Sequence, residues 1–162
     1  KGFVSEYNCR TAINFTGGRE RVEACRGRWS PMAAPDFLKK LGGKPGKVLV
    51  IPDADLRPFA AGATVLAEPP KREKVQGVAV RPRRPEEIAR DLHPHRAVIH
   101  EDGFIWTVIP KRPAMEALGV DVTFEDLLEI ALRTDLVDNK TLAFSDTEYG
   151  IRFVVPKHLR RA

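Results

Sequence analysis

The sequence has few of the features that would assign a function directly. Cys9 and Cys25 are its only cysteines and form no CxxC motif. A chain of this size needs no disulfide, so we expect free thiols in a reducing cytoplasm. No apolar run approaches the ~20 residues that span a bilayer, and the first residues carry no apolar signal core. Phosphate loops of the GxxxxGK[ST] kind and nucleophile-elbow motifs are also absent, and no cofactor is predicted.

Length and composition are ordinary for a globular protein. The chain has 162 residues, 43% of them hydrophobic and 30% charged, which suits one domain. We therefore expect a single domain over 1–162, with a poorly defined N-terminal segment, 1–30, and an α+β core, 31–162. The thirteen prolines favour short strands and stiff loops.

Three short helices are predicted from apolar spacing and from end signals. Pro35 and Pro85 suit first helical turns, and Thr123 with Asp126 forms a capping pair. The predicted helices cover 35–41, 85–92 and 124–131, and the predicted strands before the first hairpin cover 47–51, 63–67 and 75–80.

The remaining strands are predicted as hairpins. Asp102-Gly103 stands between β-rich runs and is typical of a type I′ turn, whereas 142–144 and 151–155 would pair around a polar turn through Gly150. From Phe104 to Ile109 both alternate faces are apolar, so we expect this strand to be central or covered on both sides. The expected fold class is α+β, one compact domain of mostly antiparallel β-hairpins with about three short helices.

Charge is distributed unevenly along the chain, although the net charge is only +5. Residues 1–47 carry ten Lys or Arg against four Asp or Glu, whereas 97–150 carry four against eleven. Such a dipole can attract a polyanion or pair head to tail with another copy of the chain. A solvated surface with uneven charge is the alternative.

Basic clusters are the candidate binding residues for nucleic acid or for acidic protein partners. Arginine forks fit phosphates, although no RRM, KH, zinc-finger or helix-turn-helix signature accompanies them. The candidates are Arg19, Arg21, Arg26, Arg28, Lys71, Arg72, Lys74, Arg81, Arg83, Arg84, Lys157, Arg160 and Arg161.

Carboxylates follow the apolar strand that ends at Ile51. Asp53 and Asp55 could hold Mg²⁺ there, because this ion prefers oxygen ligands. The pattern resembles the metal motif of Toprim domains and of haloacid-dehalogenase-like phosphatases over one short segment. In the phosphatases Thr or Val stands where this chain has Arg57, and the upstream glutamate of Toprim domains is not found. His93, His95 and His100 form a second candidate metal cluster, with a spacing that matches no standard zinc pattern.

We predict from these observations a non-catalytic structural or binding subunit of a larger assembly, of virion or nucleoprotein type. Its partners would be other protein subunits, its own copies or different chains, and DNA or RNA, with no membrane. The protein would be cytoplasmic, or part of the virion if viral. The alternative is a metal-dependent hydrolase or nuclease that uses Asp53 and Asp55 or the histidine cluster.

Overall fold

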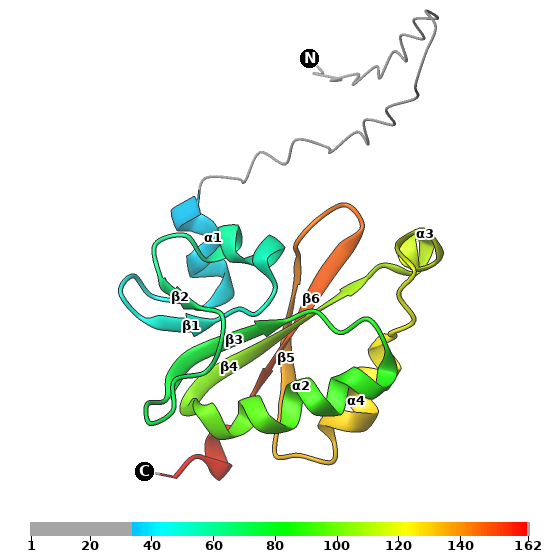
Figure 1. Ribbon diagram of the computed structural model, residues 1–162. Coiled ribbons are helices and arrows are strands. Elements are labelled where there is room, and N and C mark those ends of the chain that lie inside the picture. Colours follow the sequence, from blue (N-terminus) through cyan, green and yellow to red (C-terminus); the bar gives the residue numbers. More distant parts are fainter. Residues whose placement is uncertain (1–33, 162) are drawn as a thin grey trace, which may run out of the picture. The chain divides into compact units, whose positions relative to one another are not determined.

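The computed structural model describes residues 34–161, all of which belong to the compact unit Pro31–Ala162 (Figure 1). The boundary expected at residues 30 and 31 lies outside the described residues. The same holds for six residues that the sequence singled out, namely Cys9, Arg19, Arg21, Cys25, Arg26 and Arg28.

The three predicted helices are confirmed, and shorter helical turns add to them. α1 spans Ala34–Leu41, α2 spans Pro85–Val98 and α4 spans Phe124–Ala131. Thr123 and Asp126 form the expected capping box at α4. α2 continues past Leu92, although Pro94 lies inside it. The short elements are η1 (Ala54–Ala60), η2 (Arg112–Ala114), α3 (Met115–Leu118) and η3 (Lys157–Leu159).

Six strands form one mixed sheet in the order β2-β1-β3-β4-β6-β5. Their bounds are β1 Val48–Val50, β2 Thr64–Leu66, β3 Val75–Val80, β4 Ile99–Pro110, β5 Val137–Ala143 and β6 Glu148–Val154. β2, β1, β3 and β4 are parallel neighbours, whereas β6 runs antiparallel to both β4 and β5.

The expectation of mostly antiparallel hairpins is therefore wrong. η1 carries the chain back between β1 and β2, and α2 does so between β3 and β4, so each pair can run parallel. The hairpin predicted at Asp102-Gly103 is also wrong, because β4 runs straight through both residues. A Cβ on Gly103 would lie 2.8 Å from the carbonyl oxygen of Gln76, so this glycine permits close approach of β3 rather than a turn. Only the β5–β6 hairpin was foreseen.

Both faces of the sheet are covered, as Figure 1 shows, with α1 over one face and α2 with α4 over the other. Ile105 and Ile109 of β4 pack with the α2 and α4 side, whereas Phe104, Trp106 and Val108 pack with the α1 and η1 side. The central position predicted for this strand is confirmed, because β4 lies between β3 and β6.

Trp106 fastens α1 to the sheet. Its side chain is fully buried, and its indole Nε1 donates a hydrogen bond of 2.9 Å to the carbonyl of Leu41, the last residue of α1. Gly150 on the neighbouring β6 has no side chain at this point, and a Cβ there would lie 2.4 Å from the Phe144 ring and 2.9 Å from the Trp106 ring. This glycine is in the strand and not in a turn.

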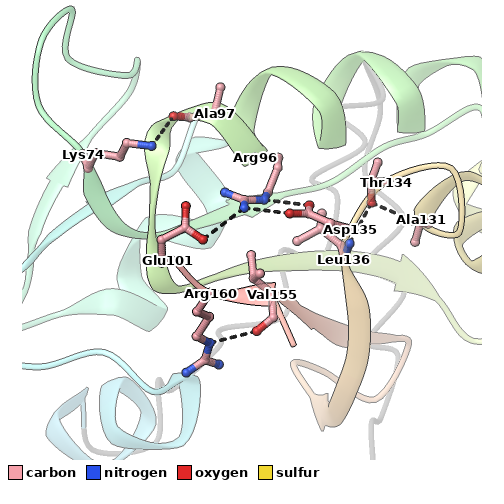
Figure 2. A network of polar contacts seen from close by, with 10 residues as sticks. All are labelled: Lys74, Arg96, Ala97, Glu101, Ala131, Thr134, Asp135, Leu136, Val155 and Arg160. Atoms are coloured by element: carbon pink, nitrogen blue, oxygen red, sulfur yellow. Dashed lines mark hydrogen bonds and ion pairs between the residues drawn. The ribbon is translucent and has the colours of Figure 1, made fainter. Parts of the chain in front are cut away.

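A polar network joins the end of α2 to the segment before β5 (Figure 2). The Arg96 guanidinium donates two hydrogen bonds of 2.8 Å to the Asp135 carboxylate and one of 3.3 Å to Glu101. These contacts hold the pKa of Asp135 below its ordinary value, chiefly through the hydrogen bond from Arg96. The network lies where α2 leads into β4 and ties this connection to the segment before β5.

Among the described residues, no helix has the length and apolar character needed to cross a membrane.

Candidate functional site

The candidate site lies at the carboxyl ends of the parallel strands. From β1 the chain crosses to β2 on one side, and from β3 it crosses to β4 on the other. This is a topological switch point, where open α/β sheets bind ligands in the crevice beyond the strand ends. We call this end of the sheet the carboxyl edge, and the end where the parallel strands begin the amino edge. β6 runs the opposite way, so its first residue, Glu148, lies at the carboxyl edge, opposite Pro110 of β4.

Arg81 stands at the switch point, directly after β3, and is surrounded by carboxylates. Its NH1 lies 3.3 Å from Oδ2 of Asp53 and 3.8 Å from Oδ2 of Asp55, and its NH2 lies 3.1 Å from Oε2 of Glu148. We call these four residues the Arg81 cluster. Three carboxylates face one guanidinium, which leaves the cluster negatively charged.

Local structure positions the two aspartates. The Asp53 carboxylate accepts a 2.9 Å hydrogen bond from the backbone N–H of Asp55 and so caps η1. Arg57, in the last turn of η1, donates hydrogen bonds of 3.1 Å to the carbonyls of Ile51 and Pro52. The backbone leaving β1 is therefore held rigidly against the start of η1.

Exposure differs sharply within the Arg81 cluster. The side chains of Arg81 and Glu148 are 12% and 16% exposed, whereas that of Asp55 is 86% exposed. Nε of Arg81 is buried and has no hydrogen-bond partner among the described residues. Asp55 is thus the carboxylate that a ligand can reach, and the other members of the cluster hold one another.

A pocket of about 290 Å³ opens at the same edge, at the end of β4. Tyr149 lines this pocket. Successive strand residues face opposite sides of the sheet, so Glu148 contacts Arg81 while the neighbouring Tyr149 points into the pocket. Burial raises the pKa of Tyr149, so its hydroxyl stays protonated at neutral pH. The exposed pair Arg112–Glu125, at 3.3 Å, also borders the pocket. The other lining residues are Ile109, Pro110, Met115, Val122, Thr123, Phe124 and Thr141.

The candidate metal ligands of the sequence do not come together. Among residues 34–161, no group of three or more His, Cys, Asp or Glu side chains is placed to hold a metal ion. Asp53 and Asp55 meet Arg81 instead. His93 and His95 lie on α2, whereas His100 lies on β4. Within α2, the Nδ1 of His95 contacts the carbonyl of Asp91. The two-residue spacing of His93 and His95 would share a face on a strand, but the helix separates them.

The predicted basic residues divide between the two ends of the parallel strands. Arg81, Arg83 and Arg84 follow β3 at the carboxyl edge, where Arg81 is paired and the other two are exposed. The opposite, amino edge has the remaining described candidates, which are Lys71, Arg72, Lys74, Lys157, Arg160 and Arg161. Whether they bind nucleic acid or protein stays a prediction.

Sequence reasoning missed Glu148, Tyr149, Arg112 and Glu125, because no local motif marks them. It also missed the parallel order of β1 and β3. The continuous apolar run of β1 is typical of a parallel strand buried on both faces and could have indicated it.

No protein-family model and no curated protein matches the sequence. Solved structures do match the fold. N-methyltransferase NodS from Bradyrhizobium japonicum WM9 gives a TM-score of 0.51 at 9% identity, over 76% of this chain and 94% of NodS. A putative type 11 methyltransferase from Sulfolobus solfataricus gives 0.51 at 9% identity, over 77% and 92%. Magnesium protoporphyrin IX methyltransferase from Synechocystis PCC 6803, with bound S-adenosyl-l-homocysteine, gives 0.52 at 10% identity, over 75% and 80%.

The chain therefore has the Rossmann-like fold of these methyltransferases. This finding contradicts the prediction of a non-catalytic assembly subunit, which rested on the short strands, the uneven charge and the lack of a catalytic set in the sequence. It contradicts the viral and structural assignment on the same ground. The hydrolase or nuclease alternative has no support either, because its metal sites are not formed.

Proposed function

We propose that the chain is an enzyme that transfers a methyl group from S-adenosylmethionine, bound at the switch point between β1 and β3. The observation that carries the proposal is the excess of carboxylates at that point, in the Arg81 cluster. The donor bears a sulfonium and an ammonium charge, so a negatively charged crevice at the strand ends favours it electrostatically.

Two exposed carboxylates are suited to contact the donor. Asp55 is the accessible member of the Arg81 cluster, and Glu68 follows β2 by two residues at the same edge. In dinucleotide-binding sheets an acidic residue about 20 residues after the first loop binds the ribose hydroxyls, and Glu68 comes fifteen residues after Asp53. We assign Asp55 to the cationic part of the donor and Glu68 to the ribose.

The exit of β1 differs from a dinucleotide-binding loop. It contains no glycine between Gly46 and Gly62, and Pro52 lacks a backbone N–H. Glycines in such loops let the backbone approach a pyrophosphate closely. S-adenosylmethionine carries no phosphate, so carboxylates at this exit suit it better than they would suit a nucleotide. When bound, the donor supplies an electrophilic methyl group.

The Tyr149 pocket is suited to hold the methyl acceptor. Its lining is mostly apolar, and the protonated Tyr149 hydroxyl can donate a hydrogen bond to an acceptor atom. Its volume of about 290 Å³ lies at the small end of the range for ligand pockets, which is about 300–1,000 Å³.

Isothermal titration with S-adenosylmethionine and with S-adenosylhomocysteine tests the proposal. We expect one donor per chain, bound about tenfold more weakly by Asp55→Asn and by Glu68→Gln. Asp55→Asn should weaken S-adenosylmethionine more than S-adenosylhomocysteine, which lacks the sulfonium charge. Glu73→Gln, an exposed glutamate before β3 at the opposite edge, is the matched control. Absence of binding, or equal weakening by the control, contradicts the proposal.

Transfer itself can be followed with methyl-labelled donor and a small-molecule extract. Label should move to an acceptor with the wild-type chain and with Glu73→Gln, but not with Asp55→Asn or Glu68→Gln. Donor binding without any such transfer would contradict the enzymatic part of the proposal and leave the binding part intact.

A further inference from the structure

Many basic residues lie at the amino edge of the parallel strands. The segment before β1 and the end of the β2–β3 loop, just before β3, lie at this edge, and so does the segment after β6, because β6 runs antiparallel to β4. Figure 1 shows the β2–β3 loop and the C-terminal segment at the same end of the sheet. The exposed basic residues of these segments are Lys44, Lys47, Lys71, Arg72, Lys74, Lys157 and Arg161.

Arg152 lies at the centre of this region and is held without an acidic partner. It projects from β6 toward α1, and its guanidinium carbon lies 5.0 Å from the centre of the Phe104 ring. A Cβ on Gly42, just past the end of α1, would lie 3.0 Å from NH2 of Arg152, so the guanidinium packs against that turn. Within residues 34–161, Arg152 forms no ion pair, and its buried Nε has no hydrogen-bond partner.

Two further cations stand beside Arg152. Arg160 donates from its Nε to the carbonyl of Val155 at 2.9 Å and turns its guanidinium away from the Arg96 network (Figure 2). Arg160 comes just after the end of β6, the strand of Arg152; burial lowers the pKa of Arg152, and the charge of Arg160 lowers it further. Lys140 is the register partner of Arg152 on β5, and its ammonium donates to the carbonyl of Lys40 at 2.8 Å.

We propose that Arg152 and Arg160, with Lys140 beside them, form a binding site for a phosphate group. Guanidinium forks match phosphate oxygens in geometry and form strong charge-assisted hydrogen bonds with them. Arg152 is partly withdrawn from water, so its attraction to an anion is screened less than that of a surface lysine. A bound phosphate would also relieve the repulsion between the two arginines.

The surrounding exposed lysines and arginines have a different part in this site. They stand on separate segments and are exposed, although the ammonium of Lys74 donates to the carbonyl of Ala97, and their charges raise the local concentration of anions and speed their arrival. The phosphate can belong to a small phosphorylated molecule or to a nucleic-acid backbone, and these sources share the same contacts.

The alternative is that Arg152 serves packing alone. The Phe104 ring attracts a cation on its face, and the carboxyl end of α1 carries a partial negative charge. Either interaction could hold Arg152 with no anion present, and neither balances its charge with a carboxylate. The two possibilities differ in what phosphate does to the protein.

Titration with pyrophosphate, at low and at high salt, tests the site. We expect one pyrophosphate per chain, bound about tenfold more weakly by Arg152→Lys and by Arg160→Gln. Arg152→Lys keeps the charge and the aliphatic stem over Phe104, so the fold should persist. Arg90→Gln on α2, 67% exposed, is the control for a changed surface charge. The Nε–Hε proton signal of Arg152 should shift on titration in the wild-type chain.

A short single-stranded oligonucleotide forms the second arm of the experiment. If the same two variants weaken its binding and the affinity falls steeply with salt, the phosphate source is a nucleic acid. If only pyrophosphate binds, the source is a small phosphorylated molecule. No saturable binding of either probe, or equal binding by wild type and both variants, overturns the proposal. Asp55→Asn should not change phosphate binding, because it lies at the opposite edge.

Discussion

The sheet holds two partly buried arginines in opposite electrostatic surroundings. Arg81, at the carboxyl edge, faces three carboxylates within 3.8 Å. Arg152, nearer the amino edge, packs on an aromatic ring and forms no ion pair within residues 34–161. Each has a buried Nε with no hydrogen-bond partner among the described residues. The same residue type is therefore paired with carboxylates at the carboxyl edge and has no carboxylate partner among the described residues near the amino edge.

The difference follows from which chain segments meet at each edge. The exits of β1 and β3 and the start of β6 meet at the carboxyl edge and bring Asp53, Arg81 and Glu148 together. The end of β6 and the entry to β1 meet at the amino edge, and acidic side chains are scarce in both. The direction of the strands thus decides which charged residues lie at the carboxyl edge and which lie at the amino edge.

The largest effect is expected from removing the guanidinium of Arg81. Arg81→Met leaves Asp53 and Glu148 partly buried without a cation, so the free energy of unfolding should fall by about 3 kcal/mol. Urea denaturation measures the change. Adding Asp53→Asn and Glu148→Gln to the same chain should restore most of the loss, because neutral side chains do not repel. A loss below about 1 kcal/mol for the single variant would mean that water screens the cluster.

Arg152→Met is expected to have a much smaller effect. The variant loses the contact between the guanidinium and the Phe104 ring, but it removes a buried unpaired donor and the repulsion from Arg160. These effects oppose each other, so the free energy of unfolding should stay within about 1 kcal/mol of wild type. The same urea series measures it. A loss as large as that of Arg81→Met would remove the distinction between the two arginines.

An effect of similar size concerns Arg96, which has one well-formed carboxylate partner and lies between the two extremes. Its hydrogen bond lowers the pKa of Asp135 in the folded state, so the stabilisation is present above the unfolded value, about 4. It is lost as the pH falls through the lower folded value. Asp135→Asn should cost about 1 kcal/mol at pH 7 and flatten the pH dependence below about pH 4. Acid titration of thermal unfolding checks this, with Asp138→Asn, an exposed neighbour, as the control.

Local patterns predicted the elements well and their partners poorly. The helices at 35–41, 85–92 and 124–131 were found because caps, prolines and apolar spacing act within one or two turns. The hairpin at Asp102-Gly103 was predicted because this pair favours a tight turn, but in β4 the glycine admits the neighbouring strand. The sequence shows that Gly103 has no side chain, but it does not show whether that permits a turn or the close approach of another strand.

The candidate site was only partly visible before the fold was known. Asp53, Asp55 and Arg81 stood out as charged residues at strand ends, but they were assigned to separate metal and nucleic-acid sites. Glu148 and Tyr149 did not stand out, because they begin a strand far away in the sequence. Their roles depend on the register of β6 with β4.

By itself the sequence determined the positions of the helices, the apolar strands, the central place of residues 104–109 and the uneven charge. These are properties of short segments, set by backbone preference and by which side chains avoid water. Only the tertiary structure decided strand order and direction, and with them which charges meet. Which strands pair depends on backbone hydrogen bonds and burial that involve the whole chain. This pairing brings together residues such as Arg81 and Glu148, which no local pattern relates.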